Sequence, residues 1–207
     1  MPSLDIVIGE FLILVFSLSV HEAAHAWTSN RLGDPTARQL GRITLNPLAH
    51  IDWIGTVLFP LIALMSHVPL LGWAKPVPVD PRNFRAPRRD FAVVAAAGPI
   101  SNLLLAVIAA AVYQVVYLNA SQPAAAWVAF FAVINITLAV FNLIPVPPLD
   151  GGNVAMGLLP MSGARLIAQI RPYGFIILYA LMLTGVLARI LFPIVDAIHD
   201  LLLPAVL

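Results

Sequence analysis

The sequence predicts an all-α protein that crosses a membrane several times, with about five to six membrane helices, a re-entrant element and short β-strands in the cytoplasmic-side loops. Sixty per cent of the 207 residues are hydrophobic, mean hydropathy is +0.93, and only 10% are Asp, Glu, Lys or Arg. Soluble domains carry roughly a quarter charged residues. Lipid must therefore surround most of the chain. Several apolar runs also approach the ~20 residues that a spanning helix needs.

The charge balance and the lack of cysteine exclude several classes of function. The net charge of +1 provides no electrostatic footprint for nucleic acid. The absence of cysteine excludes disulfides, iron–sulfur clusters and thiolate zinc sites. The first ten residues hold two acidic and no basic side chains, unlike a signal peptide. We expect residues 1–207 to form a single integral-membrane domain.

Four apolar runs predict membrane helices. The first extends from Ile6 to Trp27. The next, from Phe91 to Leu149, has no charged residue in 59 positions, and the polar segment from Asn119 to Pro123 divides it into two spans. Pro172 to Ala188 predicts another span, and Ile190 to Leu207 a further, more polar one.

The run from Trp53 to Ala74 is predicted to dip into the membrane and return. Pro60, near its middle, favours a kink because proline removes a backbone donor. Basic residues also flank the run on both sides, and they gather in cytoplasmic loops. They are Arg31, Arg38, Arg42, Lys75, Arg82, Arg85, Arg88 and Arg89. A re-entrant run leaves both basic loops on the cytoplasmic side, whereas a full span would separate them.

Two loop segments predict short strands beside the membrane. Arg42 to Leu45 is rich in β-prone residues, and so is Pro76 to Val79. Prolines in the second segment restrict it to an edge strand.

The first chemical signal is the motif His21-Glu22-Ala-Ala-His25. Side chains four apart lie on one helical face, so both imidazoles can bind one ion. Glu22 lies beside them, where it can accept a proton from water that zinc has activated. The alternative is a pair of packing histidines. Ionisable groups within a membrane span are costly unless they are paired or coordinated, which favours the metal site.

Asp150 is the candidate third ligand. It follows a proline-rich segment, Asn142 to Leu149, that must interrupt helix at membrane depth. Taken alone, this pattern is typical of an ordinary helix end. With a re-entrant Trp53 to Ala74, however, Asp150 arrives at the same cytoplasmic depth as His21 and His25. With a fully spanning run it would emerge on the opposite face.

These motifs resemble the site-2 protease family of intramembrane zinc metalloproteases, peptidase family M50, in a short form without PDZ or CBS domains. The matching residues are His21-Glu22-Ala-Ala-His25, Asn142 with Pro145 and Leu149-Asp150-Gly151, Ala97-Gly98-Pro99-Ile100-Ser101-Asn102, Gly33 to Ala37 and Gly41 to His50. The resemblance covers most of Ser19 to Asn153.

The resemblance implies a role for each matching residue. His21, His25 and Asp150 would bind one zinc ion, Glu22 would act as general base, and Asn142 would contact the substrate or transition state. Asn102 is expected to tie helices together. The substrate would be a transmembrane helix, unwound and cut within the bilayer in regulated intramembrane proteolysis. The protein would be a multi-pass cell-membrane enzyme with its active site towards the cytoplasm.

Two other functions remain open from the residues alone. A metal-ion transporter could use the intramembrane His and Asp residues as a transit site. A scaffold could bind membrane helices without cutting them. Only the peptidase needs Glu22 as a base, so Glu22→Gln should abolish peptidase activity but spare transport, and the complete set of ligands and base argues against a scaffold.

The remaining polar residues favour structural roles. His50 and His67 are possible extra metal ligands or gating residues, although a loop or capping role is favoured for His50. Asp196, His199 and Asp200 share a helical face, which an amphipathic terminal helix at the interface explains.

Overall fold

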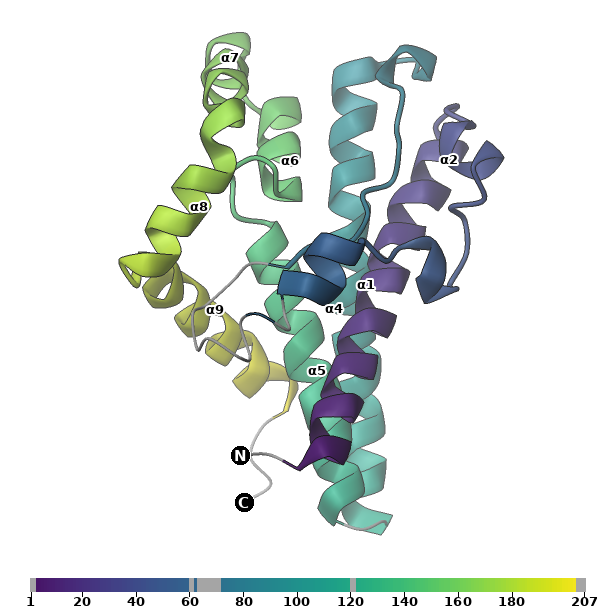
Figure 1. The fold of residues 1–207 in the computed structure, drawn as a ribbon, viewed down its shortest axis with the longest axis vertical. Coiled ribbons are helices and arrows are strands. Elements are labelled where there is room, and N and C mark those ends of the chain that lie inside the picture. The colour runs from purple at the N-terminus through teal and green to yellow at the C-terminus, as the bar shows by residue number, and fades with distance from the viewer. Residues whose placement is uncertain (1–2, 60–61, 63–71, 120–121, 204–207) are drawn as a thin grey trace.

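A computed structural model describes residues 3–59, 62, 72–119 and 122–203, and these fold as helices joined by loops (Figure 1). The α-helices are α1 (Leu4–Arg31), α2 (Thr36–Gln39), α4 (Pro87–Asn119), α5 (Gln122–Asn142), α6 (Asp150–Leu158), α7 (Met161–Ile170), α8 (Gly174–Leu183) and α9 (Val186–Leu202). Short helical turns are η1 (Pro47–Ala49), η2 (Trp53–Leu58), η3 (Pro81–Asn83) and η4 (Arg171–Tyr173).

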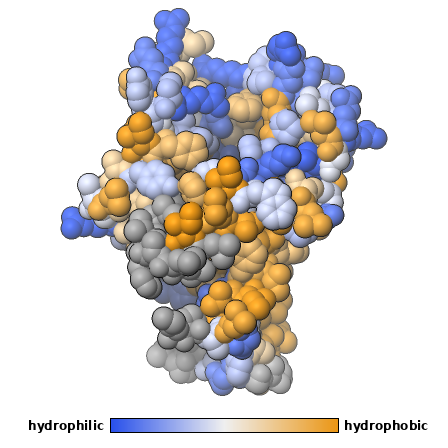
Figure 2. Space-filling view, viewed as in Figure 1, coloured by the Kyte–Doolittle hydropathy of each residue, from blue (hydrophilic) through white to orange (hydrophobic). Residues whose placement is uncertain are grey.

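Four helical segments among the described residues are long and apolar enough to cross a membrane. They are Leu4–Arg31, Pro87–Leu118, Gln122–Asn142 and Met161–Leu183. Large apolar side chains on their outer faces are exposed, Leu12 and Leu104 among them. Hydrophilic side chains gather at the end that holds α2 and α7, and hydrophobic ones over the body along α1 (Figure 2). The chain is a multi-pass membrane protein.

The prediction of five to six membrane helices is corrected by these four segments. The run from Pro172 to Ala188 is interrupted at Gly185, which has a φ of 72°, and its span begins earlier, at Met161. The run from Ile190 to Leu207 corresponds to α9, which is not one of the four. With 17 residues this helix is shorter than the ~20 residues of a span, and it carries four polar side chains, Arg189, Asp196, His199 and Asp200.

The predicted β-strands are wrong for the part of the chain described, which contains no strand. Pro76 and Pro78 have no N–H to donate, and the amides around them bind elsewhere. The Lys75 N–H donates to the His50 carbonyl at 2.8 Å, and the Val77 N–H donates to Glu22 Oε2 at 3.1 Å. No regular ladder can form from such a segment.

The re-entrant prediction for Trp53 to Ala74 depends on residues 60, 61 and 63–71, which lie outside the described residues. Its first part, Trp53–Leu58, forms the turn η2. Asp52 begins this turn by accepting hydrogen bonds from the N–H groups of Ile54 and Gly55. The re-entrant path therefore stays a prediction.

Small side chains hold the central helices together. Ala106 of α4 packs with Ile136 of α5 and with Leu191 and Val195 of α9 in one buried cluster. Ala109, Ala110 and Ala132 form a second cluster between α4 and α5. Alanines at a helix interface in lipid let the backbones approach closely, so packing and polar contacts replace the hydrophobic effect. These clusters fix α4 against α5 and α9.

Candidate active site

The two histidines of the His-Glu-Ala-Ala-His motif lie side by side on α1. His21 and His25 are both buried, and their ring centroids are 4.6 Å apart in an edge-to-face arrangement. The four-residue spacing places them one turn apart on the same helical face, as the sequence predicts. This face also carries the buried Ser17 and points towards α4 rather than towards lipid.

Asp150 reaches these histidines from the first residue of α6. Its Oδ2 lies 3.0 Å from His21 Nε2 and 3.3 Å from His25 Nε2. The glycines after it allow this approach, because a Cβ on Gly151 would lie 2.2 Å from the Leu143 carbonyl oxygen. Residues 129 positions apart in sequence thus meet, as the predicted topology requires.

The three side chains have the chemistry and spacing of a zinc site. Their ligand atoms all lie within 4.8 Å of one another. Two ligands of a tetrahedral zinc ion, each about 2.0–2.1 Å from the metal, lie about 3.3 Å apart. The distances from Asp150 Oδ2 match this value closely. Two imidazoles and one carboxylate are a common ligand set for catalytic zinc, which keeps a fourth position open.

Gly98 leaves the space beside the ligand atoms open. A Cβ on Gly98 of α4 would lie 2.4 Å from His25 Nε2 and 2.5 Å from His21 Nε2. The α4 backbone therefore borders these two nitrogens directly. Any larger residue at position 98 would intrude on an ion held between them.

Each imidazole makes a hydrogen bond through its other nitrogen. His21 Nδ1 lies 2.6 Å from Asn102 Oδ1, and His25 Nδ1 lies 2.7 Å from the Val94 carbonyl oxygen. Both partner oxygens are acceptors, so each Nδ1 donates, and in the neutral imidazole that binds a metal each Nε2 then keeps its lone pair. Such outer partners orient metal-binding histidines.

Glu22 lies beside the histidines, and its side chain is held from the opposite wall. Its Oε2 accepts a hydrogen bond from the Val77 N–H at 3.1 Å. Glu22 is 9% exposed, and it borders a cavity of about 810 Å³ that His21, His25 and Asp150 also line. Most of the remaining wall is apolar and includes Trp73, Phe91, Phe141, Phe175 and Leu178.

Comparison with known proteins agrees with this geometry. The model of peptidase family M50 matches residues 114–185. YwhC of Bacillus subtilis is 36% identical over 199 residues, which are 93% of this chain and 88% of that protein. Rip2 of Mycolicibacterium smegmatis is 30% identical over 198 residues, 93% and 75% of the two chains. Both are named as zinc metalloproteases. The chain belongs to peptidase family M50.

No solved structure matches the chain at a significant level. The M50 family and the names of these relatives identify the protein as a metallopeptidase with zinc as its cofactor. The family match covers Asn142 and Asp150 but not the histidines, which lie within the longer similarity to YwhC and Rip2.

Asn142, the predicted substrate contact of this M50 protein, borders the same cavity at the end of α5. Its Nδ2 donates to the Leu138 carbonyl of its own helix at 3.0 Å. That hydrogen bond uses one of the two amide hydrogens and fixes the side chain. Among the described residues nothing binds the other hydrogen or the Oδ1 acceptor, and both can serve a bound chain.

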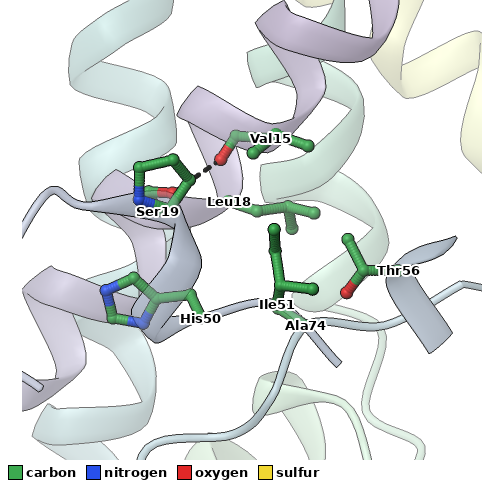
Figure 3. Close-up of a pocket in the computed structure, with 8 residues that line it drawn as sticks. Val15, Leu18, Ser19, His50, Ile51, Thr56 and Ala74 are labelled. Carbon is green, nitrogen blue, oxygen red and sulfur yellow. Dashed lines mark hydrogen bonds between the residues drawn. The ribbon is translucent and has the colours of Figure 1, made fainter. Parts of the chain in front are cut away.

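His50 has a structural role in the loop after α2. It is 2% exposed, its Nε2 lies 2.9 Å from the Thr44 carbonyl oxygen, and Arg42 Nη2 lies 3.4 Å from its Nδ1. It borders a pocket of only about 10 Å³ with Ser19 and Thr56 (Figure 3). About one water molecule fills such a space. The other candidate, His67, lies outside the described residues.

The polar residues of α9 stand apart from the zinc site. His199 Nδ1 and Asp200 Oδ1 form an exposed pair at 3.1 Å. Among the described residues, only His21, His25 and Asp150 form a group of three that could hold a metal ion. The amphipathic character of α9, with its apolar face against α5, fits the prediction of a surface helix.

Asp34, which sequence reasoning passes over as part of a loop motif, is a buried anchor for the loops beside the site. Burial opposes its ionisation, but hydrogen bonds from Thr36, the Asp80 N–H and Asn83 lower the pKa of Asp34 to about 2. Its carboxylate also accepts from Ser29 Oγ of α1 at 3.0 Å. The segment that carries Val77 is thus anchored to the end of α1 through Asp80.

Proposed function

We propose that this M50 metallopeptidase is an intramembrane zinc endopeptidase. It hydrolyses peptide bonds within or near transmembrane segments of membrane proteins, as part of regulated intramembrane proteolysis. The main support for this proposal is that His21, His25, Asp150 and Glu22 all line one cavity between apolar helices. A largely apolar cavity of about 810 Å³ suits a hydrophobic segment better than a polar loop.

His21, His25 and Asp150 would hold the zinc ion, which polarises the scissile carbonyl and activates water when bound. Glu22 accepts a proton from the attacking water and then delivers it to the leaving amine. Asn142 lies on the cavity wall, where its free amide hydrogen can stabilise charge on the carbonyl oxygen. The Val77 N–H holds one carboxylate oxygen of Glu22, so that the other faces the reacting atoms.

A helical substrate must be extended before its carbonyl can react, because its own hydrogen bonds shield the peptide bond. The irregular backbone from residues 143 to 149 and the extended segment around Val77 border the site. Pro76 and Pro78 have no N–H to donate, but their carbonyl oxygens can accept hydrogen bonds from a bound chain. Such backbone groups can replace the hydrogen bonds that an unwound substrate loses.

We propose that the active site faces the cytoplasmic side. The end of α1 that follows the histidines carries Arg31, and the start of α4 carries Arg88 and Arg89. In Figure 1 these two helix ends lie at the same end of the molecule. The tendency of basic residues to stay inside supports this orientation.

Removal of the metal and mapping of the cut bond test the proposal. We expect the protein, reconstituted in liposomes with a panel of single-span substrates, to cut bonds within or next to the hydrophobic segment, as located by mass spectrometry. A chelator should abolish cleavage and added zinc should restore it. Cleavage confined to soluble loops would contradict the intramembrane site, and zinc flux without cleavage would favour the transporter.

Val77→Pro tests whether the backbone amide orients the base. The substitution deletes the N–H that donates to Glu22, in a segment already extended around Pro76 and Pro78. A hydrogen bond to a charged group is worth ~1.5–3 kcal/mol, so kcat should fall roughly tenfold or more. Zinc content should not change. Val77→Ala, which keeps the N–H, is the matched control, and equal activity of both variants would exclude an orienting role.

A further inference from the structure

A chain of buried amides leads from the α5 backbone to His21. Asn102 Nδ2 lies 2.8 Å from Asn135 Oδ1 and 3.3 Å from the Ser17 carbonyl oxygen. Asn135 Nδ2 lies 2.9 Å from both Ser17 Oγ and the Phe131 carbonyl oxygen. The side chains come from α1, α4 and α5, and Ser17, Asn102 and Asn135 are all 0% exposed. Water cannot substitute for any of these hydrogen bonds.

The carbonyls of Phe131 and Ser17 determine which way both amides face. A carbonyl oxygen can only accept, so the NH₂ group of Asn135 must face Phe131 and that of Asn102 must face Ser17. Asn135 therefore presents its oxygen to Asn102, and Asn102 presents its oxygen to His21 at 2.6 Å. A flip of either amide would place two donors or two acceptors against each other, at a cost of ~1–3 kcal/mol for each unpaired group.

The orientation of Asn102 in turn selects the tautomer of His21. Because Asn102 Oδ1 accepts, Nδ1 of His21 carries the proton and Nε2 keeps its lone pair. Nε2 is the nitrogen that faces Asp150 Oδ2 at 3.0 Å and Gly98. The tautomer of His25 is fixed by one backbone carbonyl, that of Val94, whereas the tautomer of His21 is fixed by the side chains of Asn102 and Asn135.

We infer that Asn102 and Asn135 are positioning residues for zinc: they fix the orientation and tautomer of His21 from outside the ligand set. Asn135 contacts none of the three ligands. It affects the orientation of His21 only through its hydrogen bond with Asn102. The inference rests on the proposed zinc site, and it adds two residues that control how tightly that site binds its ion. It also explains why three buried polar side chains are maintained between apolar helices, where an unpaired amide is costly.

Zinc affinity of the purified full chain in detergent tests this inference. The metal-stripped protein is titrated with Zn²⁺ against a chelating dye, and Co²⁺ absorption reports the ligand geometry. We expect Asn102→Leu to weaken zinc binding about 10- to 100-fold. Asn135→Leu should weaken it by about tenfold or less. Asn102→Asp keeps an acceptor for Nδ1 but sets its second oxygen against the Asn135 and Ser17 oxygens, so its zinc affinity should lie between those of Asn102→Leu and the wild type.

Ser19→Ala is the matched control. Ser19 is a buried serine on α1 two residues from Ser17, and its Oγ donates to the Val15 carbonyl of its own helix at 2.7 Å. This variant should bind zinc as the wild type does, and circular dichroism should show the same helix content throughout. If Asn102→Leu does not fold, the comparison of Asn135→Leu with Ser19→Ala decides the question.

Two results would overturn the inference: wild-type affinity in Asn102→Leu or, if that variant does not fold, in Asn135→Leu; or an equal loss in Ser19→Ala. Failure of the wild type to bind zinc would instead overturn the proposed site itself.

Discussion

Replacing Glu22 with glutamine is expected to abolish peptide hydrolysis while zinc stays bound. Glutamine has nearly the same shape, and its Oε1 can still accept the hydrogen bond from the Val77 N–H that Glu22 Oε2 accepts at 3.1 Å. A carboxamide cannot take a proton from water at neutral pH, however. General acid–base catalysis contributes about 10²–10⁴-fold, so turnover should fall by roughly a thousandfold or more. Single-turnover cleavage of a single-span substrate, with zinc content measured by mass spectrometry, checks both expectations.

The chain contains a matched control for this substitution. Glu10 is the other of its two glutamates, and it lies on the same helix three turns before the site. Glu10→Gln removes the same charge from α1 without touching the cavity, so it should leave cleavage and zinc content unchanged. Cleavage that survives Glu22→Gln would contradict the role of Glu22 as base. Loss of zinc in Glu22→Gln would show that the residue supports the site rather than the reaction.

The His-Glu-Ala-Ala-His motif could be interpreted from sequence because its geometry is local. A helix places residues four apart on one face whatever surrounds it, so the pairing of His21 and His25 follows from spacing alone. Asp150 needed a second kind of information, because it lies 129 positions from His21. The distribution of basic residues supplied it by constraining which ends of the helices lie on the same side.

Other features depend on contacts that no local pattern encodes. The segment from Pro76 to Val79 has β-prone residues, but whether a ladder forms depends on where its few N–H groups point. In the structure one of them binds Glu22. Asn102 could be expected to join helices, as an amide in lipid seeks a partner. Its contact with His21 depends on how α4 is rotated against α1. The local sequence around Asn102 does not encode that rotation.

Gly98 is the clearest case of a residue whose role the sequence hides. A Gly-Pro pair within a helix indicates a kink or a close contact with a neighbouring group. It does not indicate which group that is. Here the neighbours are the two imidazole nitrogens, at 2.4 and 2.5 Å from the position of an added Cβ. Real atoms need about 3.4 Å or more, so an alanine would displace them by roughly 1 Å. Metal–ligand distances tolerate only about 0.2 Å.

We therefore expect Gly98→Ala to weaken zinc binding by roughly a hundredfold or more and to abolish cleavage with it. Alanine forms helix better than glycine by ~1 kcal/mol, so α4 itself should not unfold. Gly9→Ala is the matched steric control: its Cβ would also meet a ring atom at 2.4 Å, but that atom is the tip of the Trp127 indole, which can move aside. Zinc affinity equal to wild type in Gly98→Ala would mean that α4 can shift without cost. The open space beside the ligands would then have no role in holding the ion.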